Sequence, residues 1–114
     1  MTNPSKDKGD RAERAVVAWL TDQRGLRAER IRAGRSTDPG DITWPNSDWL
    51  LDVKDQQRWS VQEWWRNALT EAEWETRAVT PERRRIKPLL VLKRPGITNP
   101  GRWLAVVHLE DLEL

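Results

Sequence analysis

The sequence predicts an α/β fold in which a central mixed sheet is flanked by helices. Two segments repeat apolar residues at the helical period, and shorter segments are alternating or wholly apolar, as strands are. Pro/Gly-rich turn signals separate these segments. The predicted order is helix, strand, hairpin, helix, strand, strand. A length of 114 residues fits one domain spanning 1–114.

The first half of the chain predicts a helix, a strand and a hairpin. Residues 7–23 form an amphipathic pattern, and residues 27–33 are expected to form the first strand. The turn signal Asp38-Pro39-Gly40-Asp41 precedes a short strand at 42–44. A tight turn at 45–48 then leads into 49–54, the clearest strand of the chain. These last two strands predict the hairpin.

The second half predicts a helix and two strands. Residues 61–77 carry an apolar face and begin after Ser60, which has Glu63 at the spacing of a capping box. Strand 89–92 follows Pro88, and strand 103–107 follows a Pro/Gly loop at 95–101. Trp64, Trp65 and Trp74 cannot all lie on one narrow face of the helix. They predict either a partly covered core or a dimer interface.

Composition excludes several classes of protein. The absence of cysteine excludes disulfide scaffolds, thiolate zinc sites and thiol nucleophiles. The apolar runs are far shorter than the roughly 20 residues of a membrane span, and the first residues are polar, so we expect a cytoplasmic protein without a membrane partner. No Gly-rich phosphate loop is visible, so no nucleotide cofactor is expected. The single histidine, His108, is expected to be structural.

Charge is distributed unevenly along the chain. Two basic segments, 1–37 and 81–102, flank an acidic middle. Basic flanks are typical of proteins that hold a polyanion, because Lys and Arg contacts to phosphates supply most non-specific nucleic-acid affinity. A solvated arginine-rich loop is the alternative interpretation of the second segment.

Glu13 breaks the pattern of the first helix. At about 100° per residue, Val16, Val17 and Leu20 all fall within roughly 60° of it. Glu13 is therefore expected inside the apolar stripe, where a carboxylate is costly unless it is paired or bound to a metal. It could instead pair with Arg14 or with an arginine of the following strand.

The strand at 49–54 places Asp52 and Lys54 on one face, since successive side chains point to opposite faces. The turn residue Asp41 opens the neighbouring hairpin strand. Each of these residues alone could be an ordinary turn or ion-pair residue. Together they bring two carboxylates and an ammonium group to one edge of the sheet. Close carboxylates repel one another unless a divalent cation lies between them, and oxygen ligands suit Mg²⁺ or Mn²⁺.

These residues also carry a family resemblance. The segments Lys8-Gly9-x-x-Ala12-Glu13-Arg14, Arg32-Ala33-Gly34, Pro39-Gly40-Asp41-Ile42 and Leu51-Asp52-Val53-Lys54 resemble the PD-(D/E)xK nuclease superfamily. Within that superfamily, the chain is most similar to the small Holliday junction resolvases of archaea and some phages. The resemblance runs in order over residues 8–54. It departs from the family in having Pro-Gly-Asp for Pro-Asp, and Asp52 where glutamate is usual.

The resemblance implies a restriction-endonuclease-like fold (αβββαβ core) and a set of site residues. Catalysis would involve Glu13, Asp41, Asp52 and Lys54, and Mg²⁺, with Mn²⁺ as substitute, would be held by Glu13, Asp41, Asp52 and the Val53 carbonyl. Lys54 would act on the attacking water. It further implies a homodimer that cuts branched DNA, a four-way junction, in a bacterial or phage-infected cell.

The candidate DNA contacts combine the resemblance with the two basic segments. They are Lys8, Arg32, Arg35, Ser36, Gln56, Arg83, Arg84 and Arg85. Three rival functions stay open from sequence alone: a nuclease with another DNA target, a catalytically idle DNA-binding module, and a Trp-rich protein adaptor.

Overall fold

The computed structural model describes residues 4–34, 40–79 and 85–114 as an α/β fold built on one five-stranded sheet. Its helices are α1 (Pro4–Arg24) and α2 (Val61–Val79). Its strands are β1 (Glu29–Ile31), β2 (Asp41–Thr43), β3 (Trp49–Lys54), β4 (Lys87–Leu92) and β5 (Leu104–Val106). Two 3-10 turns, Pro100–Arg102 and Leu109–Asp111, flank β5. Among the helices in these ranges, none combines the length and apolarity needed to cross a bilayer.

The sheet is mixed, with strand order β1-β2-β3-β4-β5. The β1–β2, β2–β3 and β4–β5 pairs are antiparallel, whereas β3 and β4 are parallel. A parallel neighbour requires a crossover, and α2 supplies it. The predicted element order and the hairpin are therefore confirmed, and β3 has the predicted bounds. The short strand β2 lies one residue earlier than predicted, so Asp41 is itself part of the sheet.

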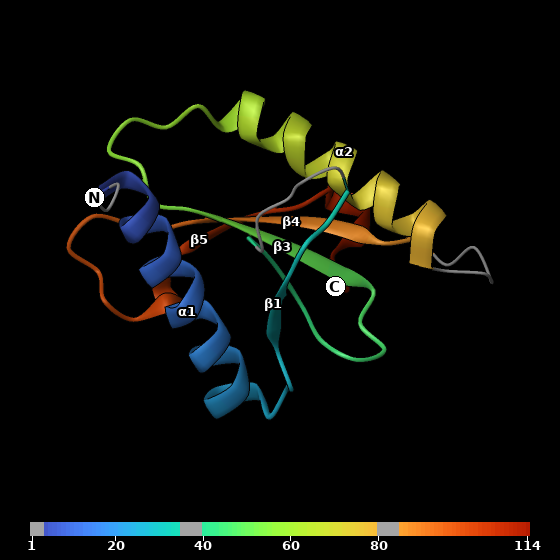
Figure 1. Ribbon diagram of the computed structural model, residues 1–114, viewed down its shortest axis with the longest axis horizontal. Helices are drawn as coiled ribbons and strands as arrows, with labels where there is room; N and C mark the ends of the chain where they lie inside the picture. The colour runs from blue at the N-terminus through green and yellow to red at the C-terminus, as the bar shows by residue number, and fades with distance from the viewer. Residues whose placement is uncertain (1–3, 35–39, 80–84) are drawn as a thin grey trace.

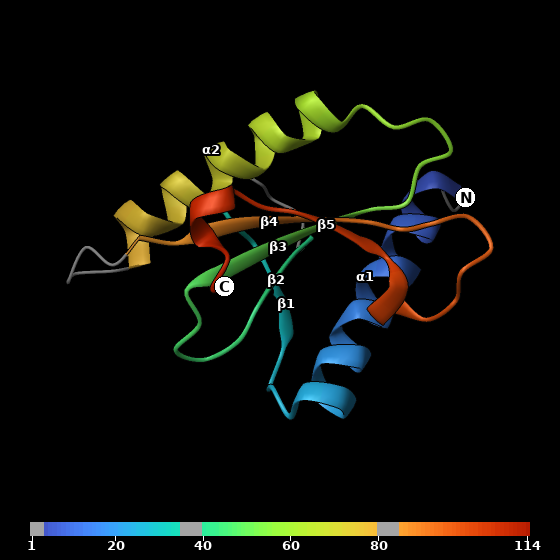
Figure 2. The same cartoon turned by 180° about the vertical axis from the view of Figure 1, so that it is seen from behind.

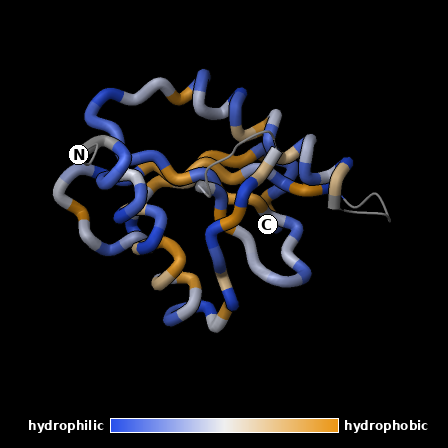
Figure 3. The backbone as a smooth tube through the Cα atoms, in the orientation of Figure 1, coloured by the Kyte–Doolittle hydropathy of each residue, from blue (hydrophilic) through white to orange (hydrophobic). Residues whose placement is uncertain are grey.

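The two helices lie on opposite sides of the sheet (Figure 1). The face toward α1 holds a core cluster that includes Val16 and Leu20 from the helix and Leu51, Val53 and Val91 from the strands. Side chains alternate along a strand, so Leu50, Asp52 and Lys54 of β3 point to the opposite face, toward α2. The apolar colour concentrates along the strands between the helices (Figure 3).

The C-terminal strand and turn complete the far edge of the sheet (Figure 2). There Asp111 is buried and accepts two hydrogen bonds from Arg85, at 2.5 and 3.1 Å. His108 packs edge-on against Trp65, with ring centroids 4.9 Å apart. This contact agrees with the structural role predicted for His108.

Candidate metal centre

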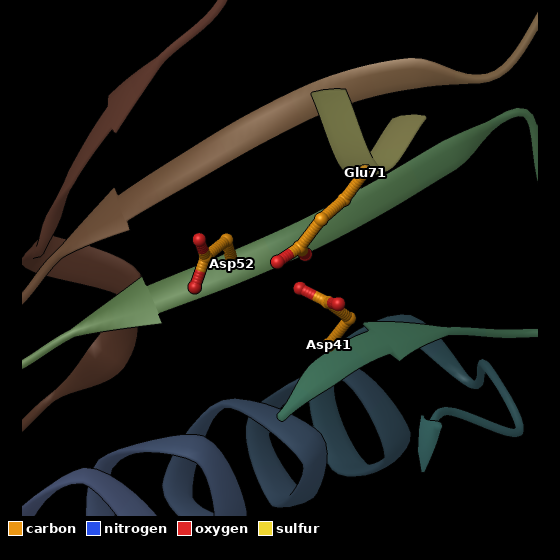
Figure 4. Close-up of side chains that lie close together, drawn as sticks. All are labelled: Asp41, Asp52 and Glu71. Atoms are coloured by element: carbon orange, nitrogen blue, oxygen red, sulfur yellow. The ribbon is translucent and has the colours of Figure 1, made fainter. Parts of the chain in front are cut away.

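Three carboxylates from three elements converge on the α2-facing side of the sheet. Asp41 and Asp52 are direct cross-strand partners in the β2–β3 pair, and Glu71 extends from α2 toward them (Figure 4). One oxygen from each lies within 4.8 Å of the others. Asp41 is 4% exposed and Asp52 9% exposed, so two of the three are buried. Oxygen atoms clustered at this spacing form a site that could hold a metal ion.

The local fold explains why the two aspartates meet. In the antiparallel β2–β3 pair, Asp41 lies opposite Asp52 and Ile42 lies opposite Leu51. Ile42 and Leu51 both belong to the core cluster beneath α1. Burial of this apolar pair therefore fixes the register, and a slip by one residue would turn the aspartates into the core.

Burial and mutual repulsion govern the ionisation of this cluster. Burial, the hydrogen-bonding neighbour Glu71 and the charge of Asp52 all raise the pKa of Asp41 far above its usual range. Burial likewise raises the pKa of Asp52 to about 6, although Lys54 opposes the shift. A proton held on Asp41 can bridge the Asp41–Glu71 pair when no cation is bound. A divalent cation would replace that proton, because metal ligands must be deprotonated.

Glu71 was missed by the sequence analysis, which assigned the helix to the core or an interface. Its Oε2 atom is buried and makes no hydrogen bond to any other described residue. A signal was present in the sequence. Glu71 lies three residues after the buried Ala68, which places it about 60° away around the helix. The same angular test that singled out Glu13 would therefore have found it.

Lys54 accompanies the acids as predicted. Its Nζ lies 3.7 Å from Asp52 Oδ1, and its side chain is about one-third exposed. The ammonium group therefore faces both the carboxylates and the solvent. Val53 lies between the two with its side chain in the opposite core, and its carbonyl as a metal ligand stays a prediction.

Glu13 lies beside the cluster and is held by arginine. Arg30 Nη2 is 2.7 Å from Glu13 Oε2 and 2.8 Å from Asp10 Oδ1, which confirms the alternative of a pair with a strand arginine. The other oxygen, Oε1, would lie 3.5 Å from a Cβ built on Gly40, next to Asp41. Burial raises the pKa of Glu13 to about 7 against the effect of Arg30, and the charge of Asp52 adds to the rise. Glu13 is thus a neighbour of the triad and not one of its three members.

The predicted DNA-contact residues are distributed over several regions. Lys8 and Gln56 line one cleft, whereas Arg32 is exposed just after β1. Arg85 is bound to Asp111 at the amino end of β4. Arg35, Ser36, Arg83 and Arg84 lie outside the described residues.

Comparison with known proteins identifies no relative of the chain. No family model, curated protein or solved structure matches the chain. The chemistry of the site is accordingly inferred from its own residues.

Proposed function

We propose that this protein is a Mg²⁺-dependent endodeoxyribonuclease of the PD-(D/E)xK type, with a restriction-endonuclease-like fold. The supporting observation is the placement of Asp41 opposite Asp52, with Lys54 two residues further along the same face of β3. Three clustered acids, Asp41, Asp52 and Glu71, lie beside the partly exposed Lys54, an arrangement better suited to a bound cation than to stability.

The donor set fits a hard divalent cation. Asp41, Asp52 and Glu71 offer oxygen atoms alone, the ligand type that favours Mg²⁺ or Mn²⁺ over zinc. A bound cation of this kind supplies charge stabilisation for a phosphodiester and lowers the pKa of a coordinated water. Such an ion would provide a partner for the buried Glu71 oxygen that makes no hydrogen bond to another described residue. It would also replace the proton that the raised pKa of Asp41 favours.

The side chains around the triad can perform the remaining tasks of hydrolysis. Attack of water on phosphorus forms one P–O bond and breaks the bond to the 3′ oxygen, which leaves a 5′-phosphate and a 3′-hydroxyl. Lys54 can orient that water and balance the charge that develops on the phosphate. Glu13, with a pKa of about 7, can exchange a proton near neutral pH.

The proposed substrate is branched DNA, and we propose that a homodimer cuts two opposed strands of a four-way junction. The resemblance of residues 8–54 to junction resolvases supports this choice. The absence of a groove-reading motif in the sequence also suits recognition of shape.

Cleavage of a synthetic four-way junction tests the proposal. Wild type should nick the junction symmetrically with Mg²⁺ and do nothing in EDTA. Asp52→Asn should bind the junction but cut it at least about 10²-fold more slowly, because the site loses a ligand and its charge. Asp22→Asn, the same change on the exposed surface of α1, is the matched control and should cut normally.

Other outcomes of this experiment would distinguish the rival functions. Equal cutting of plain duplex would overturn the junction assignment and leave the nuclease. Binding without any Mg²⁺-dependent cutting by wild type would indicate an idle DNA-binding module. Absence of salt-dependent DNA binding would favour a protein adaptor.

A further inference from the structure

A second charged cluster lies at the carboxyl ends of the parallel strands β3 and β4. The backbone N–H of Lys93 donates to the Lys54 carbonyl at 3.0 Å, so the pairing of the two strands continues to their last residues. The chain segments after β3 and after β4 lie at the same side of the molecule as the start of α1 (Figure 1). Carboxyl ends of parallel strands are a common location for ligand sites in α/β proteins.

One carboxylate holds two lysines at this edge. Asp55 Oδ1 lies 3.6 Å from Lys8 Nζ, and Asp55 Oδ2 lies 3.3 Å from Lys93 Nζ. The Asp55 side chain is only 11% exposed, whereas the two lysine side chains are 45% and 34% exposed. Lys93 is further fixed over the Trp103 ring, 5.8 Å from its centroid. Two ammonium groups from distant parts of the chain are thereby held side by side.

The cluster borders an open cleft of about 240 Å³. Lys8, Lys93 and Asp55 line it together with the amide side chains of Gln56 and Gln57. Two ammonium groups and one carboxylate leave a net charge of +1, which matches the single negative charge of a phosphodiester. The amides add hydrogen-bond donors for phosphate oxygens.

We propose that this cleft binds a backbone phosphate of the DNA substrate about three nucleotides from the one that is cut, and that Asp55 is a positioning residue that holds the two lysines in place. The assignment to DNA rests on the proposed function. Asp55 follows the metal-centre residue Asp52 by three positions and lies just beyond the end of β3, so at roughly 3.3 Å per residue the cleft is displaced about 10 Å from Asp52 in the strand direction. At about 3.4 Å of duplex axis per nucleotide, that separation corresponds to about three nucleotides.

Salt-dependent binding in EDTA tests the cleft separately from catalysis. The fluorescence anisotropy of a labelled four-way junction would be titrated with protein between about 50 and 200 mM salt. Lys93→Gln and Lys8→Gln should each weaken binding several-fold and lower the slope of log affinity against log salt by about 0.9, the loss of one phosphate contact. Lys87→Gln is the matched control, because Lys87 begins β4, which Lys93 directly follows, and because Lys87 also lies over a tryptophan ring, Trp49, at 5.2 Å. It should leave both the affinity and the slope unchanged.

Asp55→Asn separates positioning from simple charge. Removal of a negative charge near DNA should strengthen binding if the lysines act only through their charge. If Asp55 positions them, the variant should bind DNA less tightly than wild type despite its extra positive charge. In the Asp55→Asn background, a further Lys93→Gln change should then have little additional effect on the affinity for DNA. Circular dichroism would verify the fold of each variant.

The outcomes distinguish this proposal from the proposed function. The proposed cleft would be overturned if Lys8→Gln and Lys93→Gln had the same slope of log affinity against log salt as wild type and Lys87→Gln. This holds whatever the nuclease activity is. Tighter binding by Asp55→Asn would overturn its positioning role. Wild type that binds DNA with the predicted slopes but never cuts it would overturn the nuclease and support the cleft. Wild type that binds no DNA would overturn both.

Discussion

At the scale of single residues, the main feature is a group of carboxylates placed where ionisation is unfavourable. Asp41 and Asp52 are buried against each other, and Glu71 approaches both. Buried acids without a cationic partner destabilise a fold, because desolvation penalises their charged form. Asp111 shows the contrast, since Arg85 pairs with it and lowers its pKa. The cluster could hold a metal ion, and its arrangement is unfavourable for stability when no cation is bound.

These pKa shifts predict how stability depends on pH without metal. Asp41, Asp52 and Glu13 all have raised pKa values, with Asp52 at about 6 and Glu13 at about 7. Each binds its proton more tightly in the folded protein than in the unfolded chain. Their stabilisation is therefore complete below about pH 4, the ordinary carboxyl pKa, and is lost as pH rises through the folded values.

We expect the Tm in EDTA to be lower at pH 8 than at pH 5 by at least about 4 °C, the change that roughly 1 kcal/mol produces in a domain of this size. Saturating Mg²⁺ should remove the decrease, because the cation binds the deprotonated acids. Asp41→Asn should flatten the EDTA profile. Calorimetry at the two pH values measures all three effects, and a Tm that rises from pH 5 to pH 8 in EDTA would contradict them.

At the scale of elements, α2 must approach the sheet closely for Glu71 to reach the aspartates. The segment after β1 helps to hold it there. Gly34 has a positive φ of 59°, and a Cβ at this position would lie 3.4 Å from Glu71 Cα. Its N–H also donates to Glu75 Oε1 at 3.4 Å. The positive φ favours glycine at this position, and a Cβ there would be in van der Waals contact with α2.

Gly34→Ala should therefore weaken Mn²⁺ binding several-fold as well as lower stability by about 1–2 kcal/mol. Gly25→Ala provides a matched control, because Gly25 has nearly the same φ, 66°, but nothing lies within 4 Å of its Cβ position. It should show a similar loss of stability without a change in metal affinity. Urea denaturation and Mn²⁺ titration measure the two properties. Equal metal affinities for the two variants would show that this contact does not position Glu71.

Much of the architecture was predictable because apolar pattern and turn chemistry agree. β3 was predicted to the residue, since Trp49, Leu51 and Val53 form an unbroken apolar face. The β2 strand was displaced by one position, because Asp41 was assigned to the preceding turn. In the fold its polar side chain faces α2, where Asp52 also lies.

The sequence predicted the part of the candidate site that lies within the hairpin. It did not predict the part that depends on how α2 packs against the sheet. Asp41, Asp52 and Lys54 follow from strand alternation and a tight turn. The arrival of Glu71 depends on how α2 crosses the sheet, which local patterns do not specify. For Glu13, the sequence showed a buried acid but could not choose between Arg30 and a metal as its partner.

At the scale of the whole molecule, the fold assembles a site from elements far apart in the chain. β2 and β3 supply the aspartates, and the crossover helix between β3 and β4 supplies Glu71. Just beyond the carboxyl ends of β3 and β4, the Lys8–Asp55–Lys93 cluster adds positive charge. Under the proposed function, this combination would hold a polyanion through the cations of the protein and hydrolyse it at the metal.

The most direct test of this account is Mn²⁺ titration, followed by electron paramagnetic resonance, of wild type, Glu71→Gln and Glu73→Gln. Both variants change one glutamate of α2, but Glu73 is exposed whereas Glu71 faces Asp41 and Asp52. We predict that Glu71→Gln binds Mn²⁺ at least about 10-fold more weakly than wild type, as loss of a ligand or its support typically causes. Glu73→Gln should bind as wild type does. Equal affinity in the two variants, or no Mn²⁺ binding by wild type, would contradict the claim that these three carboxylates form a metal centre.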